Sequence, residues 1–358
     1  MKNLIISILL FSSYLCAAQR PQEPKPPFPY YSEEVMFYNQ AQDVKLSGTL
    51  TLPKKGFRGT TVVLVTGSGP QDRNEEVFGH KPFLVLSDYL TRAGIGVLRY
   101  DDRGVGSSTG EFKDATSHDF SLDAEAAVDY LHRRRFKRVG MLGHSEGGSI
   151  TIMNAARNPE LAFAVLLASP GIRGDSLLLL QQEAVARNAG WPESTIRFTR
   201  EANRQVFELL ESNPEVEKLM DTLKFTVRTL MGSDFPEEPF EDDRMEKNVE
   251  MQIARTTNPW MLYFLRYDPA SGLRKINCPV LALNGGEDLQ VTPQANIGAI
   301  ESALHQGGNT HFETEIFPGL NHLFQACKTC SVSEYAELEE TINEKVLARI
   351  AVWINGLY

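Results

Sequence analysis

A serine flanked by glycines stands where an apolar run changes into a stretch with helical spacing. The motif GHSEG occupies residues 143–147, directly after the strand-like residues 139–142. Glycines two positions either side of Ser145 would let backbone segments approach where a side chain would clash, so that the chain turns sharply and exposes the hydroxyl. The pattern predicts a nucleophilic serine for acyl transfer. The alternative is an ordinary glycine-rich turn in which Ser145 caps the next helix.

A serine hydroxyl is a weak nucleophile at neutral pH and needs a histidine base. Of the three histidines after Ser145, His322 lies in a turn immediately after the strand-like residues 312–317. His305 and His311 flank the polar loop before that strand, so they belong to the opposite edge of a sheet. We therefore expect His322 to be the base, against the alternative of a structural role at the surface.

The carboxylate that orients the histidine should follow the preceding strand, because the order in such sites is serine, acid, histidine. Residues 280–283 are apolar and lead into the sequence NGGED, which ends in Glu287 and Asp288. We favour Asp288, since it precedes the tight return into the next helix-like stretch. Sequence alone leaves Glu287 open, and the acid that is not used would be a helix cap or a surface residue.

Acyl transfer also needs donors for the developing oxyanion, commonly two backbone N–H groups. One would belong to Glu146, the residue after the nucleophile. The other should come from the loop TGSGP at residues 66–70, and we expect it to be the amide of Ser68. A glycine-rich loop of this kind could instead hold a phosphate, but no lysine follows at the spacing of a nucleotide-binding loop, and no dinucleotide-binding glycine pattern is present.

Strand-like and helix-like stretches alternate along most of the chain. Two antiparallel strands are expected first, and then repeated strand–helix units, which are typical of a mostly parallel sheet with helices on both faces. The expected strands are residues 34–38, 44–52, 61–65, 96–100, 139–142, 162–168, 280–283 and 312–317. The expected helices are residues 82–93, 121–134, one from 145 onward, 177–188, 194–210, 216–230, 293–304 and 333–356.

These patterns divide the chain into segments. Residues 1–18 read as a signal peptide and residues 19–32 as a proline-rich extended lead-in. An α/β core is expected over residues 33–171 and 276–358. Between them, residues 172–275 show no strand-like run and are expected to form a helical cap inserted over one edge of the sheet.

The amino-terminal apolar run, residues 4–11, is much shorter than the roughly 20 residues that span a bilayer. We therefore expect cleavage near Ala18 and a secreted or periplasmic protein without a stable membrane span. Lipidation at Cys16 is disfavoured by the bulky Tyr14 and Leu15. The formal net charge of −10 and the lack of a basic stripe argue against a nucleic-acid partner.

Four motifs together resemble the α/β-hydrolase superfamily, in the branch that contains bacterial carboxylesterases and serine aminopeptidase-like hydrolases. They are GSGPQDR at residues 67–73, RYDDRG at 99–104, GHSEGG at 143–148 and GLNH at 319–322. The resemblance covers nearly the whole chain after the expected signal. One departure from this family pattern is Thr66, where many relatives carry a histidine.

The resemblance implies attack by Ser145 on a carbonyl, with His322 as base and then acid and Asp288 holding its tautomer. Neither a metal nor an organic cofactor is required. The leading hypothesis is a carboxylesterase for small or medium uncharged esters, with acylated carbohydrates as one candidate. The rivals are an exported aminopeptidase-like amide hydrolase and a catalytically silent binding module.

Two charged features have competing interpretations. Asp102 and Arg103 could touch substrate, but we expect them to pair with each other and fix the loop near the oxyanion residues. In the expected cap, four acids could clamp a peptide amino terminus, although a solvated acidic face is the simpler interpretation. These acids are Glu237, Glu238, Glu241 and Asp242.

The cysteines and aromatic residues allow weaker predictions. Cys327 and Cys330 could form a small disulfide near His322 or remain two free thiols, and no second cysteine pair exists to complete a zinc site. Cys278 is expected to be inert core. Two or three aromatic or apolar residues of the cap are expected to touch the acyl group, among Trp191, Phe198, Phe207, Trp260, Met261, Tyr263 and Phe264.

Overall fold

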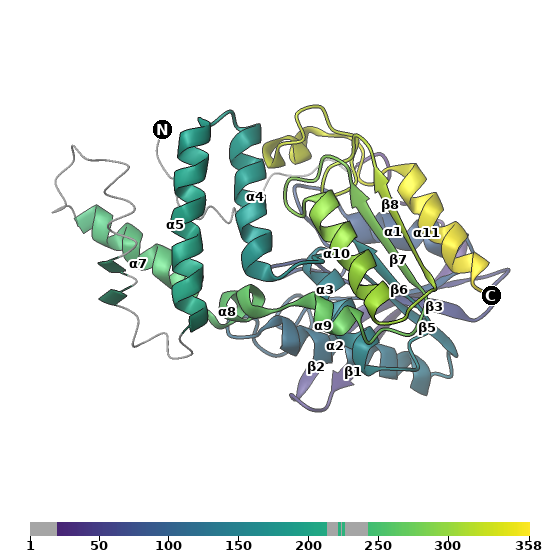
Figure 1. Cartoon of the computed structure of the whole chain (residues 1–358). Coiled ribbons are helices and arrows are strands. Elements are labelled where there is room, and N and C mark those ends of the chain that lie inside the picture. The colour runs from purple at the N-terminus through teal and green to yellow at the C-terminus, as the bar shows by residue number, and fades with distance from the viewer. Residues whose placement is uncertain (1–19, 213–220, 223, 226–242) are drawn as a thin grey trace.

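The structure is a computed structural model that describes residues 20–212, 221–222, 224–225 and 243–358. An eight-stranded sheet forms its centre (Figure 1). The strands are β1 (Tyr30–Asn39), β2 (Val44–Pro53), β3 (Thr60–Val65), β4 (Gly96–Tyr100), β5 (Arg138–His144), β6 (Ala164–Leu167), β7 (Val280–Gly285) and β8 (Phe312–Phe317). Their order across the sheet is β1-β2-β4-β3-β5-β6-β7-β8.

The sheet is antiparallel at one end only. β1 pairs antiparallel with β2, and β2 antiparallel with β4, whereas all other neighbours are parallel. The six residues of β3 are all buried, because the strand has neighbours on both sides and helices on both faces. This arrangement confirms the fold class predicted from the alternation of strands and helices.

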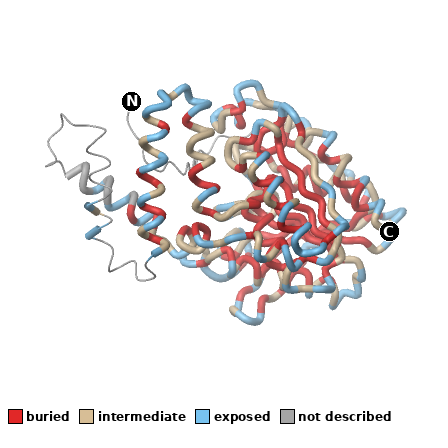
Figure 2. The backbone as a smooth tube through the Cα atoms, viewed as in Figure 1, coloured by how far each residue is buried: buried red, intermediate tan, exposed pale blue. Residues whose placement is uncertain are grey.

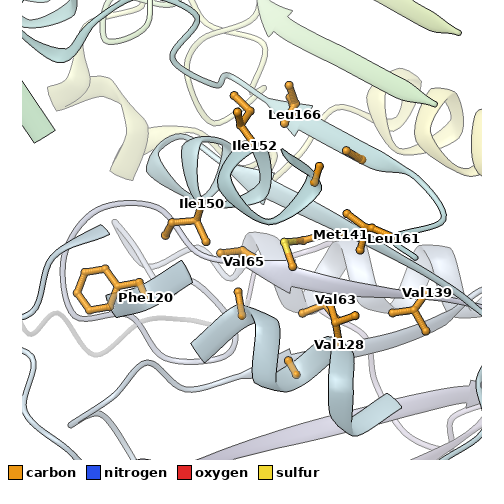
Figure 3. Close-up of a cluster of buried hydrophobic side chains, with 14 of the residues drawn as sticks. Val63, Val65, Phe120, Val128, Val139, Met141, Ile150, Ile152, Leu161 and Leu166 are labelled. Atoms are coloured by element: carbon orange, nitrogen blue, oxygen red, sulfur yellow. The ribbon is translucent and has the colours of Figure 1, made fainter. Parts of the chain in front are cut away.

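Helices cover both faces of the sheet. On one face lie α1 (Pro82–Arg92) and α11 (Glu344–Gly356). The other face carries α2 (Ser117–Arg133), α3 (Glu146–Arg157), α9 (Pro269–Leu273) and α10 (Pro293–Gln306). Figure 3 shows one such contact, where Phe120 and Val128 of α2 and Ile150 of α3 pack near Val63 and Met141 of the sheet. The buried backbone is concentrated in the sheet and in the sides of the helices that face it (Figure 2).

Between β6 and β7 the chain forms further helices. These are α4 (Gly174–Asn188), α5 (Glu193–Ser212), α7 (Asp243–Thr257) and α8 (Pro259–Arg266). In Figure 1 α4 and α5 stand side by side, on the side of the sheet away from α11. They share with α8 a small apolar core of their own, which includes Leu178, Phe207 and Met261. The helix expected at residues 216–230 and the four acids of the expected clamp lie largely or wholly outside the described residues.

Two expected boundaries were wrong near the amino terminus. β1 begins at Tyr30, inside the expected lead-in, because Tyr30 pairs with Pro53 in the sheet and its hydroxyl donates to Asp88. Helix α2 begins at Ser117, four residues before its expected start. A capping box produces this earlier start, since the Asp119 carboxylate accepts the N–H of Thr116 at 2.8 Å.

The single helix expected over residues 333–356 was also wrong. The structure has a short 3₁₀ helix, η1 (Val332–Glu337), and then α11 from Glu344. The side chain of Asn343 accepts the N–H of Lys345 and so sets the start of α11. Before it, the amide of Gln325 holds the carbonyl of Glu340 at 2.8 Å and keeps this stretch out of a helix.

β1 and β8 are the edge strands of the sheet. On β8, Glu313 and Glu315 both form ion pairs with Arg349 of α11, at 2.6 and 2.8 Å. Within the described residues, none of the helices has the length and apolarity to span a membrane.

Candidate active site

Ser145 occupies the sharp turn between β5 and α3. Its backbone has φ +54° and ψ −121°, a conformation that costs a non-glycine residue of the order of 1–3 kcal/mol and is typical of functional sites. The residues on either side, His144 and Glu146, are buried, but Ser145 itself is partly exposed. The turn therefore presents this serine, and not its neighbours, to the outside of the core.

The glycines of the motif are required by close backbone contacts. A Cβ at Gly143 would lie 1.9 Å from the carbonyl oxygen of Gly147, and a Cβ at Gly147 would lie 2.1 Å from that of Val65. Non-bonded atoms in proteins do not approach so closely, so any side chain at either position would clash with the backbone. The spacing of the motif thus has the physical cause that the sequence suggested: α3 starts directly against the ends of β3 and β5.

His322 and Asp288 lie together in the loops that follow β8 and β7. The Nδ1 atom of His322 is 2.8 Å from Oδ2 of Asp288, and both side chains are buried. The other oxygen of Asp288 accepts the backbone N–H groups of Gln290 and Val291 at 2.8 and 2.9 Å. These contacts fix the carboxylate, and the carboxylate in turn fixes the edge of the ring that carries Nδ1.

The other candidates from the sequence lie elsewhere. Glu287 is exposed, and its backbone N–H donates to the carbonyl of Leu320, so the structure brings Asp288 and not Glu287 to the histidine. His305 and His311 are also exposed, before β8. His322 instead reaches the nucleophile turn, because its ring centroid is 4.8 Å from that of His144, the residue before Ser145.

The loop after β3 lies directly beside the serine. A Cβ at Gly67 would be 3.3 Å from the Cβ of Ser145, so the backbone of this loop passes the nucleophile at contact distance. Ser68 is the next residue. Glu146 is the first residue of α3, where a helix leaves its N–H groups without an internal acceptor. The two amides expected to bind an oxyanion thus come from segments that adjoin Ser145.

The side chain of Glu146 has a structural role that the sequence did not indicate. Its buried carboxyl accepts hydrogen bonds from Ser117 Oγ at 2.5 Å and from Trp260 Nε1 of α8 at 2.8 Å, and it also contacts the Ser68 side chain. Burial raises the pKa of Glu146 above its ordinary value. One carboxyl therefore joins the nucleophile turn, the loop of Ser68 and a helix of the insertion.

The expected pair of Asp102 and Arg103 was wrong. Arg103 instead forms a buried ion pair with Asp123 of α2, at 2.7 Å. Asp102 accepts the hydroxyl of Thr66 at 2.9 Å and the N–H of Gln71 at 3.0 Å, so it holds both ends of the loop that contains Ser68. Burial raises the pKa of Asp102 well above its ordinary value. Asp102 and Arg103 are adjacent in the sequence, but their side chains bind different parts of the structure: Asp102 binds the loop after β3, and Arg103 binds α2.

Replacing Asp102 with alanine should lower stability more than the rate of the folded fraction. The loss of two hydrogen bonds to a carboxyl would reduce the free energy of unfolding by about 2–4 kcal/mol. Urea unfolding would measure this, and kcat per titrated active site would measure the rate. If kcat falls by a factor that corresponds to more free energy than the loss in the free energy of unfolding, Asp102 belongs to the catalytic machinery.

The loop after His322 contains the disulfide Cys327–Cys330, one of the two alternatives for this pair. The Glu334 carboxylate closes the same loop by accepting the N–H groups of Thr329 and Cys330 at 2.9 and 2.7 Å. Cys278 is free and partly buried, and burial raises its pKa to about 11. In the part of the chain that the structure describes, no group of three or more His, Cys, Asp or Glu side chains is arranged to hold a metal ion.

Comparisons with known proteins identify the family of this chain. The profile of the hydrolase family described as "Serine aminopeptidase, S33" matches residues 82–325. Esterase EstD of Thermotoga maritima is 27% identical over 316 residues, which span 86% of this chain and 65% of the relative's own length.

Solved structures share the fold at low sequence identity. The esterase Pf2001 of Pyrococcus furiosus superposes with a TM-score of 0.52 at 16% identity, over 91% of this chain and 93% of the other. A proline iminopeptidase of Mycobacterium smegmatis superposes with a TM-score of 0.53 at 17% identity, over 91% and 98%. From the family profile, which covers most of the core, and from the shared α/β-hydrolase fold, we conclude that this chain belongs to the serine aminopeptidase S33 family of hydrolases.

Proposed function

We propose that the protein is a serine hydrolase that cleaves carboxylic esters through an acyl-enzyme on Ser145, with His322 as general base and Asp288 as the acid that orients it. The observation that carries the proposal is the 2.8 Å contact between His322 Nδ1 and Asp288 Oδ2, at the edge of the sheet where Ser145 turns into α3. Asp288 accepts a hydrogen bond from the N–H group at Nδ1, which leaves the lone pair of Nε2 free to take a proton from serine.

The reaction then proceeds in two steps, formation of the acyl-enzyme and its hydrolysis. Oγ of Ser145 attacks the ester carbonyl while Nε2 of His322 takes its proton, and the amides of Ser68 and Glu146 stabilise the oxyanion. Collapse of the intermediate breaks the bond to the alcohol oxygen, which leaves with the proton from His322. Water then attacks the acyl-enzyme while His322 takes its proton. The bond to Oγ of Ser145 breaks, Oγ regains a proton from His322, and the carboxylic acid is released.

For the substrate, we propose a small or medium uncharged ester, with acylated carbohydrates as candidates. Trp260 donates to Glu146, the residue after the nucleophile, so its ring lies next to the site, and Phe264 stacks on it at 5.4 Å. Such a surface favours an apolar acyl group. The recorded name of the Thermotoga relative, an esterase, also supports ester cleavage.

The second candidate is hydrolysis of an amino-terminal amide, which the family description and the shared fold of the iminopeptidase favour. The same triad can perform it. It would require an anionic group to bind a free amine, and Glu237, Glu238, Glu241 and Asp242 remain the predicted source.

We also propose that the protein is exported. The apolar run of residues 4–11 supports a signal peptide, and the Cys327–Cys330 disulfide suits an oxidising compartment.

A fluorophosphonate probe tests the proposed chemistry. We expect the folded protein to be labelled, and mass spectrometry of the peptides to place the label on Ser145. Matched nitrophenyl esters and aminoacyl nitroanilides should then separate the two candidates, with ester turnover at least tenfold faster. Faster cleavage of the anilides would favour the peptidase, whereas absence of labelling would leave only a silent binding module.

A further inference from the structure

A second histidine, His144, lies between two hydrogen-bond acceptors behind the site. Its Nδ1 is 2.9 Å from Oε1 of Glu75, and its Nε2 is 3.0 Å from the backbone carbonyl oxygen of His322. A neutral imidazole carries a single N–H and can satisfy only one of these oxygens. The doubly protonated imidazolium satisfies both.

Glu75 is placed to be the counter-ion. Its Oε1 also accepts the N–H of Gly67 at 2.7 Å, and the residue is 3% exposed. Its second oxygen is buried and has no hydrogen-bond partner among the described residues. Burial by itself lowers the pKa of His144, but the Glu75 carboxylate outweighs it and holds that pKa above its ordinary value. A buried carboxylate with one unmet oxygen needs the neighbouring cation, because an unpaired charge in this environment is costly.

Each contact of this pair involves a residue of the site or its direct neighbour in the sequence. Gly67 precedes Ser68, His144 precedes Ser145, and the carbonyl that His144 binds belongs to His322. The pair therefore ties together three segments that are far apart in the sequence: the loop after β3, the end of β5 and the turn after β8. No other contact in the described site joins these three segments through one pair of side chains.

We infer that Glu75 and His144 form a buried carboxylate–imidazolium pair that positions the oxyanion loop and the catalytic histidine around Ser145. This inference rests on the proposed function. Glu75 and His144 are positioning residues, since neither touches the reacting atoms. Glu75 fixes the backbone immediately before Ser68, and His144 fixes the backbone of His322.

Two variants test the inference. Glu75→Gln removes the counter-ion, and His144→Gln keeps one amide donor but removes the charge. We expect kcat to fall about 10- to 100-fold in each with KM changed less than threefold, because misplaced donors weaken the transition state more than substrate binding. His80→Gln is the matched control, since His80 is a buried histidine held by Thr341 and Tyr335, and it should leave kcat unchanged.

A readout without activity tests the protonation state itself. In protein labelled with ¹⁵N-histidine, one ring should show two exchange-protected N–H signals at neutral pH, and both should vanish in His144→Gln. A neutral His144 with one N–H signal would overturn the inference even if a variant fails to fold. Labelling of wild-type Ser145 by the fluorophosphonate probe separates the outcomes: without it the proposed function fails, whereas labelling with unchanged kcat in both variants rejects the positioning role alone.

Discussion

Replacement of Ser145 with alanine should lower kcat for ester hydrolysis by a factor on the order of 10⁵–10⁶. It should also abolish labelling by the fluorophosphonate probe. The covalent route depends on this one oxygen, and what remains comes from oxyanion donors and substrate binding. The loss should appear in kcat, since the substrate still meets the same surfaces. Initial rates with a short-chain nitrophenyl ester, at matched protein concentration, measure it.

The fold should tolerate this change. Alanine takes the same backbone conformation as serine at φ +54°, so the melting temperature should move by less than about 2 °C. Ser149→Ala is the matched control, because Ser149 lies on the same helix with a buried hydroxyl that finds no partner among the described residues. It should retain at least half of the wild-type kcat. Turnover of Ser145→Ala within tenfold of wild type would mean that the nucleophile is another residue.

Replacement of Asp288 with asparagine should lower kcat by about 10⁴-fold while the protein stays folded. The amide oxygen can still accept the N–H groups of Gln290 and Val291, which hold the loop. The amide nitrogen then faces Nδ1 of His322 and donates to it, which moves the ring proton to Nε2. A ring with its proton on Nε2 cannot take the proton of Ser145.

Glu287 offers the control for this second variant, because it stands beside Asp288 in sequence but is exposed. Glu287→Gln should keep kcat within twofold of wild type. Steady-state rates of both variants, normalised to the fraction that unfolds cooperatively, decide between the two acids. A large loss in Glu287→Gln with a small one in Asp288→Asn would reverse the assignment.

The order of the main elements was predictable because it depends on local pattern. Buried parallel strands appear in the sequence as continuous apolar runs. The close backbone contacts at positions 143 and 147 require glycine, so the motif around the serine can be recognised from the sequence. Asp288 and His322 could be placed near each other by the rule that loops after parallel strands share an edge. These steps need only the residue types and their order.

The remaining features depend on contacts between distant segments. His144 reads as a variable position within a motif, and Glu75 as one of two adjacent acids in a polar loop; nothing local shows that they meet 69 residues apart. The Glu146 side chain likewise depends on Trp260, 114 residues away. The break before α11 was missed for the same reason, since the irregular stretch before Asn343 is held by Gln325 and not by its own sequence.

The edge strand β8 influences whether copies of this protein associate with one another. Because β8 has a neighbour on one side only among the described residues, its outer backbone groups could pair with the same strand of a second copy, a common route to aggregation. Glu313 and Glu315 place negative charge along this edge, and Arg349 holds them in position from α11. Two such edges repel each other when they approach, so the ion pairs that fasten α11 to the sheet also protect the folded protein from edge-to-edge association.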